Sequence, residues 1–210
     1  MVLEKILWDK YGFNPIVLKD LTIENMTNVN LRKQLQKLVE KGVLQRAGRG
    51  IYYFPQKSKL LNTLIRPSDE KIIERKFIKD ENGNVFGYLT GYNIANLIGL
   101  TTQVPAVNYV MSNRASNEYR KLKVGNTRVV LLKSYVEVTS ENYKVLRFLD
   151  LLICMDKYSE LDEKDLQEKL RAYVRKEKLM FKDMEKYLEF YPDGIYKGLY
   201  RAGVLKETIA

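Results

Sequence analysis

The stretch from Thr27 to Pro55 constrains the fold of this chain more than any other part of the sequence. One apolar stripe of an α-helix is formed by residues at offsets of zero, four, seven and eight, namely Leu31, Leu35, Leu38 and Val39. Gly42 follows the stripe, where a left-handed helix cap belongs. β-Prone residues at 43–44 and 51–54 then flank a glycine-rich turn at 47–50. The pattern predicts a helix, a glycine stop and a two-stranded ribbon.

The segments before this stretch predict further helices. Val2 to Tyr11 has helical apolar spacing, and Ile16 to Leu21 is long enough for a short middle helix. Thr22 to Asn28 reads as a turn, and Thr27 or Asn28 is suited to cap the next helix. Three helices followed by a ribbon are the order of a winged helix-turn-helix, whose recognition helix enters the major groove.

The face opposite the apolar stripe is polar and basic, and it supplies the candidate DNA contacts. Asn30 and Lys33 lie near the helix start, where Asn can read adenine and Lys guanine. Arg32 lies nearer the apolar stripe and suits a phosphate contact. The full set of candidates is Asn28, Asn30, Arg32, Lys33, Lys37, Arg46 and Arg49. A lysine-rich helix face can also be merely solvated, so the following ribbon with its two arginines is what favours DNA binding.

The charge distribution supports a polyanionic partner for the N-terminal part. The 210 residues carry a formal net charge of +10, of which +7 falls in residues 1–66, +3 in 67–140 and none in 141–210. Basic charge concentrated on one segment is typical of a nucleic-acid-binding domain. The alternative is a generally basic surface that serves solubility.

Several classes of protein are disfavoured by what the sequence lacks. Histidine is absent, which removes histidine bases, Ser-His or Cys-His catalysis and histidine metal sites. The single cysteine, Cys154, lies in an apolar run and reads as a buried residue in a reducing compartment. No run of about 18 apolar residues occurs, and the N-terminus reads as an amphipathic helix rather than a signal peptide. We therefore expect a cytoplasmic protein that is not an enzyme, binds no metal or cofactor and does not enter a membrane.

The expected fold class is α+β, with two domains. Arg66-Pro67-Ser68 is the predicted boundary, because Pro67 disfavours helix at Arg66 and Ser68 can cap a new helix. Residues 1–66 form the predicted winged helix-turn-helix. Residues 67–210 form a mixed α/β domain with a small sheet at 85–138 and helices at 141–205.

Two features of the second domain have open interpretations. The loop Gly99 to Pro105, with the sequence GLTTQVP, reads as a turn held by hydrogen bonds of Thr and Gln side chains to the backbone, although it is unusual in an apolar neighbourhood. A possible second basic patch comprises Arg114, Arg120, Lys121, Lys123 and Arg128. Strand alternation places Lys121 and Lys123 on one face. This patch could bind RNA, extend a DNA footprint or meet an acidic partner, and a solvated sheet face explains it equally well.

Several segments together resemble AbiEi-type antitoxins of type IV toxin–antitoxin, or abortive infection, systems. They are KLVEKGVLQRAG (37–48) with RGIYYFP (49–55), GYLTGYNIANLIGLTTQVPAVNYVMSNRAS (87–116), KSYVEVTSENYKVLRFLDLL (133–152) and FYPDGIYKGLY (190–200). The wing ending in RG-x-Y and the GLTTQVP loop are the most specific pieces. The resemblance covers nearly the whole chain, although Gln36 stands where relatives often have arginine.

The resemblance implies a transcriptional autorepressor that binds inverted repeats in its own promoter through a winged helix. It further implies an antitoxin domain that counteracts a nucleotidyltransferase toxin of the AbiEii type, without a stable complex. We expect a monomer in solution that binds DNA cooperatively. The alternatives are an antitoxin that binds the toxin directly through its C-terminal domain, and an enzyme that reverses the toxin's modification, which the missing histidine and motifs disfavour.

Overall fold

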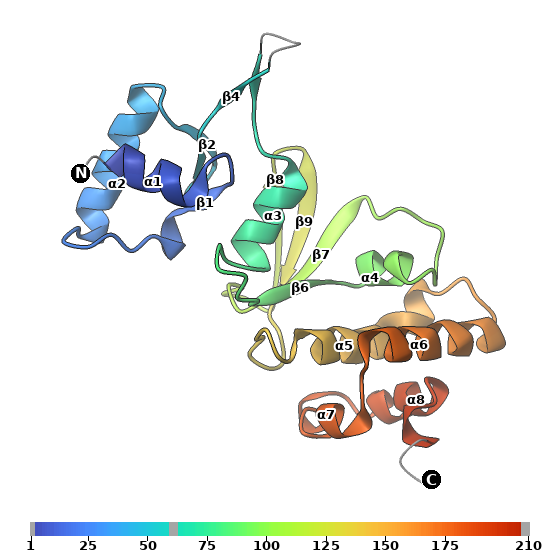
Figure 1. Cartoon of the computed structure of the whole chain (residues 1–210). Coiled ribbons are helices and arrows are strands. Elements are labelled where there is room, and N and C mark those ends of the chain that lie inside the picture. The colour runs from blue at the N-terminus through green and yellow to red at the C-terminus, as the bar shows by residue number, and fades with distance from the viewer. Residues whose placement is uncertain (1–2, 59–62, 207–210) are drawn as a thin grey trace. The chain divides into compact units, whose positions relative to one another are not determined.

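The structure is a computed structural model that describes residues 3–58 and 63–206 and has the expected α+β class (Figure 1). Contacts between Cα atoms divide the chain into two compact units. The first comprises Met1–Gly83 and Lys123–Thr127, and the second comprises Asn84–Leu122 and Arg128–Ala210. None of the helices formed by the described residues combines the length and the apolar character that a membrane crossing requires.

The first unit is built from short elements around one core. In chain order these are α1 (Leu3–Tyr11), β1 (Ile16–Val17), a 3-10 turn (Leu18–Asp20), α2 (Asn28–Glu40), β2 (Gln45–Gly48), β3 (Ile51–Tyr53), β4 (Gln56–Lys57), β5 (Leu64–Ile65) and α3 (Asp69–Phe77). The antiparallel strands of the first sheet have the order β1-β3-β2. The core is filled by side chains of α1, α2 and β3, including Leu7, Leu35 and Tyr52.

The predicted middle helix at 16–21 is wrong. Ile16 and Val17 instead form β1 and pair with Tyr52 and Ile51 of β3, and only a single 3-10 turn follows. Both residues are β-branched and buried, so they satisfy strand geometry and the core at once.

The segment after the ribbon returns on itself as a second hairpin. Gln56 pairs with Ile65 and Lys57 with Leu64, and all four residues are exposed. Figure 1 shows this hairpin, labelled β4, projecting from the helices of the first unit. Residues 59–62, between the two strands in the chain, lie outside the described residues.

Helix α3 belongs to the first unit. Ser68 caps it as predicted, since its hydroxyl accepts a hydrogen bond from the Lys71 N–H at 3.3 Å. Arg75 of α3 is buried and forms ion pairs with Asp20, at 3.0 Å, and with Glu81. The division by contacts therefore falls at Gly83 rather than at the predicted boundary of residues 66 and 67.

The second unit contains most of a four-stranded sheet of order β6-β7-β9-β8, whose β8–β9 turn at Lys123–Thr127 belongs to the first unit. The strands are β6 (Gly87–Thr90), β7 (Val107–Ser112), β8 (Tyr119–Val124) and β9 (Thr127–Leu132), with α4 (Tyr92–Leu97) between β6 and β7. Strand β7 runs antiparallel to β6 and parallel to β9. The turn between β8 and β9 is at Gly125 and Asn126, and Gly125 has a φ of +57°.

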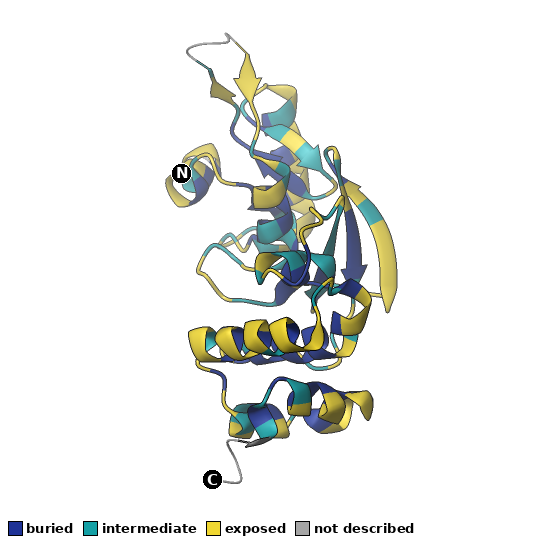
Figure 2. Ribbon diagram, turned by 90° about the vertical axis from the view of Figure 1, so that its right-hand side faces the viewer, coloured by how far each residue is buried: buried dark blue, intermediate teal, exposed yellow. Residues whose placement is uncertain are grey.

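Helices complete the second unit: α5 (Tyr143–Tyr158), α6 (Glu163–Glu177), α7 (Phe181–Glu185) and α8 (Gly194–Arg201). The long helices bury one side and expose the other (Figure 2). Helix α7 is followed by a 3-10 turn at Leu188–Phe190. Gly198 of α8 lies directly against α5, where an added Cβ would stand 2.8 Å from the Cβ of Leu152.

This contact predicts opposite effects for two glycines of α8. Gly198→Ala should lower the free energy of unfolding by about 1–3 kcal/mol, because the new methyl group overlaps Leu152. Gly194→Ala is the matched control, since a Cβ there meets nothing within 4 Å and alanine favours helix. Urea unfolding curves of the two variants would test the contact, and equal stability of both would contradict close packing of α8 on α5.

Candidate functional site

The recognition-helix candidate α2 buries its leucines on one face and exposes its polar residues, together with Val29, on the other. Thr27 caps it as predicted, accepting a hydrogen bond from the Asn30 N–H at 3.3 Å. Leu31, Leu35 and Leu38 are buried. Gly42 follows the helix with a φ of +72°, which confirms the predicted glycine stop. The burial of the leucines forces the opposite side of α2 into solvent.

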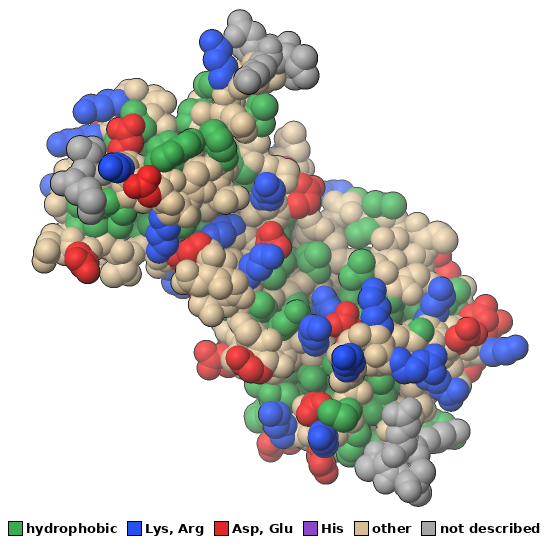
Figure 3. Space-filling view, in the orientation of Figure 1, with side chains coloured by type: hydrophobic (Ala, Val, Ile, Leu, Met, Phe, Trp, Pro, Cys, Tyr) green, Lys and Arg blue, Asp and Glu red, His purple; other side chains and the backbone are tan. Residues whose placement is uncertain are grey.

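All of the predicted contact residues of α2 lie on this exposed side: Asn28, Asn30, Arg32, Lys33 and Lys37. Figure 3 shows basic side chains along the outer edge of the first unit, over α2. In the described part of the chain, Arg32, Lys33 and Lys37 form no ion pair. Unpaired cations on a rigid helix are available to phosphate groups.

The ribbon β2–β3 presents the two predicted arginines at and near its tip. Arg49 and Gly50 form the turn, and Gly50 has a φ of +71°, which favours glycine. Both Arg46 and Arg49 are exposed. The Arg46 Nε donates a hydrogen bond to the Gly48 carbonyl at 3.2 Å, which holds that side chain along the ribbon. The Tyr53 hydroxyl donates to the Gln45 Oε1 at 2.6 Å and ties the two strands together.

The second basic patch is only partly brought together. Arg120, Lys121 and Lys123 are exposed on the edge strand β8, and Arg128 is exposed at the start of β9. Arg114 does not join them, because its guanidinium lies over the Phe86 ring at 3.9 Å. Lysine on an edge strand also prevents pairing with other chains, so the solvated interpretation stays open.

The GLTTQVP loop is held by two polar side chains from outside the loop, Asn96 of α4 and Glu160, which follows α5. Glu160 accepts hydrogen bonds from the Thr102 N–H at 3.0 Å, the Thr102 hydroxyl and the Gln103 amide. Asn96 donates to the carbonyls of Thr101 and Gln103. The predicted bonding of side chains to backbone is confirmed for Thr101, whose hydroxyl accepts from the Gln103 N–H, but not for the Gln103 amide, which bonds to Glu160 instead. The loop therefore has a fixed shape, and it presents Val104 with 85% of its surface exposed.

A buried carboxyl group in the second unit escaped the sequence analysis. Asp150 of α5 is 5% exposed and accepts hydrogen bonds from the hydroxyls of Tyr88, at 2.8 Å, and Tyr191, at 3.2 Å. Burial raises the pKa of Asp150 to about 7, against the opposing effect of these hydrogen bonds. The available signal was a lone acid flanked by apolar residues on both sides in the run from Val145 to Leu152.

Cys154 lies one turn after Asp150 and is partly buried. Burial, aided by the nearby Asp150 charge, raises the pKa of its thiol to about 12. A thiol with so high a pKa is poorly nucleophilic near neutral pH. The structure therefore gives Cys154 a packing role.

The geometry defines an α+β protein. Its first unit exposes a basic helix and ribbon, and its second unit holds a buried polar network. A family profile described as "Family of unknown function (DUF6088)" matches residues 2–181, and the chain belongs to this family. No curated protein matches the chain significantly.

The buried carboxyl group predicts a specific pH dependence of stability. The pKa of Asp150 is higher in the folded than in the unfolded state. Its contribution to the free energy of unfolding is therefore fully present below about pH 4 and is lost as the pH rises through 7. The lost contribution is about 4 kcal/mol for a shift of this size. Asp150→Asn keeps the shape but cannot ionise, so its stability should fall less over this window.

Urea unfolding at pH 4 to 8 for both proteins measures the effect, because other titrating groups cancel in the difference. Parallel pH profiles for the two proteins would contradict a raised pKa at Asp150.

Proposed function

We propose that the first unit is a winged helix-turn-helix that binds double-stranded DNA, with α2 as recognition helix and the β2–β3 ribbon as wing. The single observation that carries this proposal is the exposed basic face of α2, fixed in place by the buried leucines on its other side. The 3-10 turn at Leu18–Asp20 takes the place of the middle helix. The concentration of positive charge in residues 1–66 supports the same partner.

The exposed side chains divide into two roles. Asn30 and Lys33, in the first turns of α2, read base edges in the major groove. Arg32, Lys37 and the wing residues Arg46 and Arg49 contact phosphates or the minor groove, with Asn28 at the helix start beside them. These contacts would position the protein on an inverted repeat, with one copy for each half-site.

We further propose that the protein is a non-enzymatic transcriptional autorepressor and antitoxin. The basis is the resemblance to AbiEi-type antitoxins, which extends from the wing through the GLTTQVP loop to residues 190–200. In this proposal residues 1–66 repress the protein's own promoter, and residues 67–210 counteract a nucleotidyltransferase toxin of the AbiEii type. It acts in the cytoplasm and needs no cofactor.

A second candidate function is direct binding of the toxin by the second unit. The observation that favours it is the fixed GLTTQVP loop, which exposes Val104 next to a helix that exposes 70% of Leu97. Exposed apolar side chains on a rigid loop are typical of a protein-binding surface.

Two substitutions test the DNA-binding proposal. Lys33→Ala should weaken binding to the protein's own upstream duplex by about 1–3 kcal/mol and reduce discrimination against unrelated DNA. Arg49→Ala should weaken binding to the upstream duplex and to unrelated DNA by the same factor. It should also reduce the slope of log affinity against log salt concentration by about 1. Fluorescence anisotropy at several salt concentrations measures both.

Lys71→Ala, an exposed lysine of α3, is the matched control and should leave affinity unchanged. If Lys33→Ala and Arg49→Ala bind as the unmodified protein does, with the same salt slope, the DNA surface lies elsewhere.

The second candidate is tested at Val104. Val104→Asp places a charge on the most exposed apolar side chain of the loop, and a hot-spot loss of about 2 kcal/mol would weaken toxin binding roughly thirtyfold. Titration calorimetry with the toxin and survival of cells producing it would record the loss, while DNA affinity stays constant. Met180→Asp adds the same charge at a half-exposed helix cap and should bind the toxin normally. Full binding by Val104→Asp would exclude this loop as the contact.

A further inference from the structure

One apolar side chain stands on the exposed side of α2. Val29, in the first turn of the helix, is 64% exposed, whereas the leucines of α2 are buried and Val39 is partly buried against the core of the first unit. A single exposed valine is common on protein surfaces. What distinguishes Val29 is its position among the candidate DNA contacts.

The helical repeat places Val29 near the centre of this exposed side. Successive residues of an α-helix are rotated by about 100°, so Val29, Lys33 and Gln36 lie on one ridge, roughly opposite the buried leucines. The Gln36 amide donates to the Glu40 carboxylate at 3.1 Å, which directs that side chain towards the C-terminal end. Val29 and Lys33 therefore form the ridge in the first turns of α2, the part of a recognition helix that contacts base edges.

The folding of the first unit does not require an apolar residue at this position. Valine favours helix less than alanine does, because its branched side chain loses rotamer freedom. The apolar contact that often stabilises a helix start joins the residue before the cap to the fourth helical residue. Here these are Met26 and Leu31, and both pack in the core of the first unit. Val29 is thus free to make a contact outside the chain.

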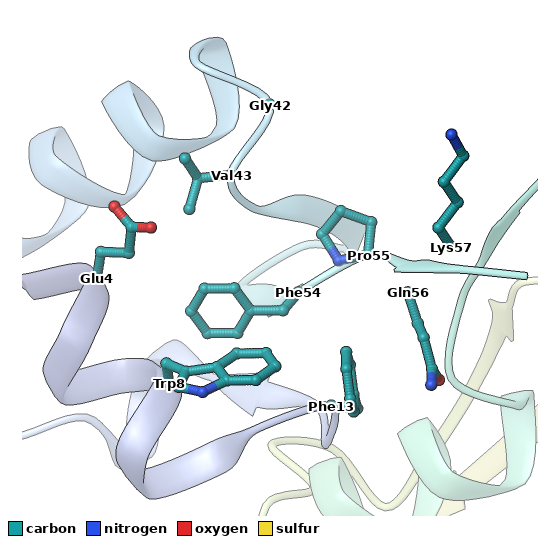
Figure 4. A pocket seen from close by; sticks show the side chains of 9 residues that line it. All are labelled: Glu4, Trp8, Phe13, Gly42, Val43, Phe54, Pro55, Gln56 and Lys57. Atoms are coloured by element: carbon teal, nitrogen blue, oxygen red, sulfur yellow. The ribbon is translucent and has the colours of Figure 1, made fainter.

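The helix that carries Val29 is anchored at its other end. The Val43 N–H donates to the Leu38 carbonyl at 3.0 Å. Figure 4 shows the Val43 side chain and the Phe54 ring beneath the turn that follows α2, and Phe54 meets the Trp8 ring edge-on at a centroid distance of 5.1 Å. Valine in a helix also has one strongly preferred rotamer. A contact made by Val29 therefore costs little ordering of the side chain or of the helix.

Thymine offers an apolar group to such a side chain in the major groove. Its C5-methyl group projects there and is contacted by small apolar side chains. The neighbouring Asn30 and Lys33 can pair with polar base edges but not with a methyl group. We propose that Val29 contacts the methyl group of one thymine in each half-site and so determines part of the sequence specificity, an inference that rests on the proposed DNA binding by α2.

Helix geometry restricts where this thymine stands in the half-site. A rise of about 1.5 Å per residue separates Val29 from Lys33 by about 6 Å along α2. Successive base pairs are about 3.4 Å apart. The thymine should therefore lie within about two base pairs of the base that Lys33 contacts.

The experiment exchanges the thymines of the protein's own upstream duplex for deoxyuridine, one at a time, which removes only the methyl group. Fluorescence anisotropy should show one position in each half-site where the exchange weakens binding about fourfold, as expected for one methyl group no longer removed from water. Synthetic duplexes contain no 5-methylcytosine, which carries the same group, so the loss belongs to thymine.

Variants of Val29 assign this loss to one side chain. Val29→Ala should weaken binding to the unmodified duplex and should bind the thymine and deoxyuridine duplexes equally well, since the contact is already absent. Val29→Thr keeps one methyl group and should retain part of the deoxyuridine effect. Leu64→Ala is the matched control, because it shortens an exposed apolar side chain of the first unit outside α2, and it should change neither affinity nor the deoxyuridine effect.

Val29→Ala should fold normally, because the position is exposed and alanine favours helix, and its urea unfolding curve verifies this. Two outcomes would overturn the inference while DNA binding stands. One is specific, salt-dependent binding in which no single exchange of thymine for deoxyuridine weakens affinity. The other is a deoxyuridine effect that persists at full size in Val29→Ala. A protein without salt-dependent affinity for its own upstream duplex would instead overturn the proposed function, and this inference with it.

Discussion

The burial of three leucines on one side of α2 determines which side chains the first unit offers to a partner. Each fully buried leucine contributes about 1.5–3 kcal/mol, and Leu31, Leu35 and Leu38 lie in one core with α1 and β3. Rotating the helix would expose them and would carry Lys33 or Lys37 towards an apolar interior, where an unpaired charge is costly. The basic face is therefore a consequence of packing, and no separate interaction is needed to orient it.

A buried arginine holds the next part of the first unit together. Arg75 links α3 to the 3-10 turn through Asp20 and to the following loop through Glu81, which also meets Lys10 at 2.9 Å. Burial opposes the charge of Glu81, but its hydrogen bond and attraction to these cations outweigh that effect and lower its pKa to about 2. Removing one partner of such a network leaves a buried charge uncompensated, at a cost of about 3–5 kcal/mol. This network, rather than a linker, joins α3 to the elements before it.

The sequence predicted the local structure correctly where a local rule and a core position agree. The caps at Thr27 and Ser68, the glycine stop at Gly42 and the leucine stripe were predicted because each depends on a few neighbouring residues. The strand at Ile16 and Val17 was not predicted, because these residues owe their strand conformation to β3, which lies more than thirty residues further on. Long-range hydrogen bonds of the second unit were missed for the same reason. Glu160 binds the loop at 101–103, and the hydroxyls of Tyr88 and Tyr191 bind Asp150. No spacing rule relates these residues in the sequence. The seven candidate DNA contacts were all placed in solvent, as a helix stripe and a ribbon turn predict.

The two units use polar side chains for different physical purposes. In the first unit, the cations of α2 and the ribbon remain hydrated, so their attraction for a polyanion acts through solvent and depends on salt. In the second, Asp150 is withdrawn from solvent and held by two tyrosine hydroxyls, so its energy depends on protonation and hardly on salt. Changes in ionic strength should therefore act on the proposed DNA binding of the first unit, whereas changes in pH near 7 should act on the stability of the second unit. Because the two responses arise from different groups, a salt series and a pH series can assign a functional defect to one unit before any residue is changed.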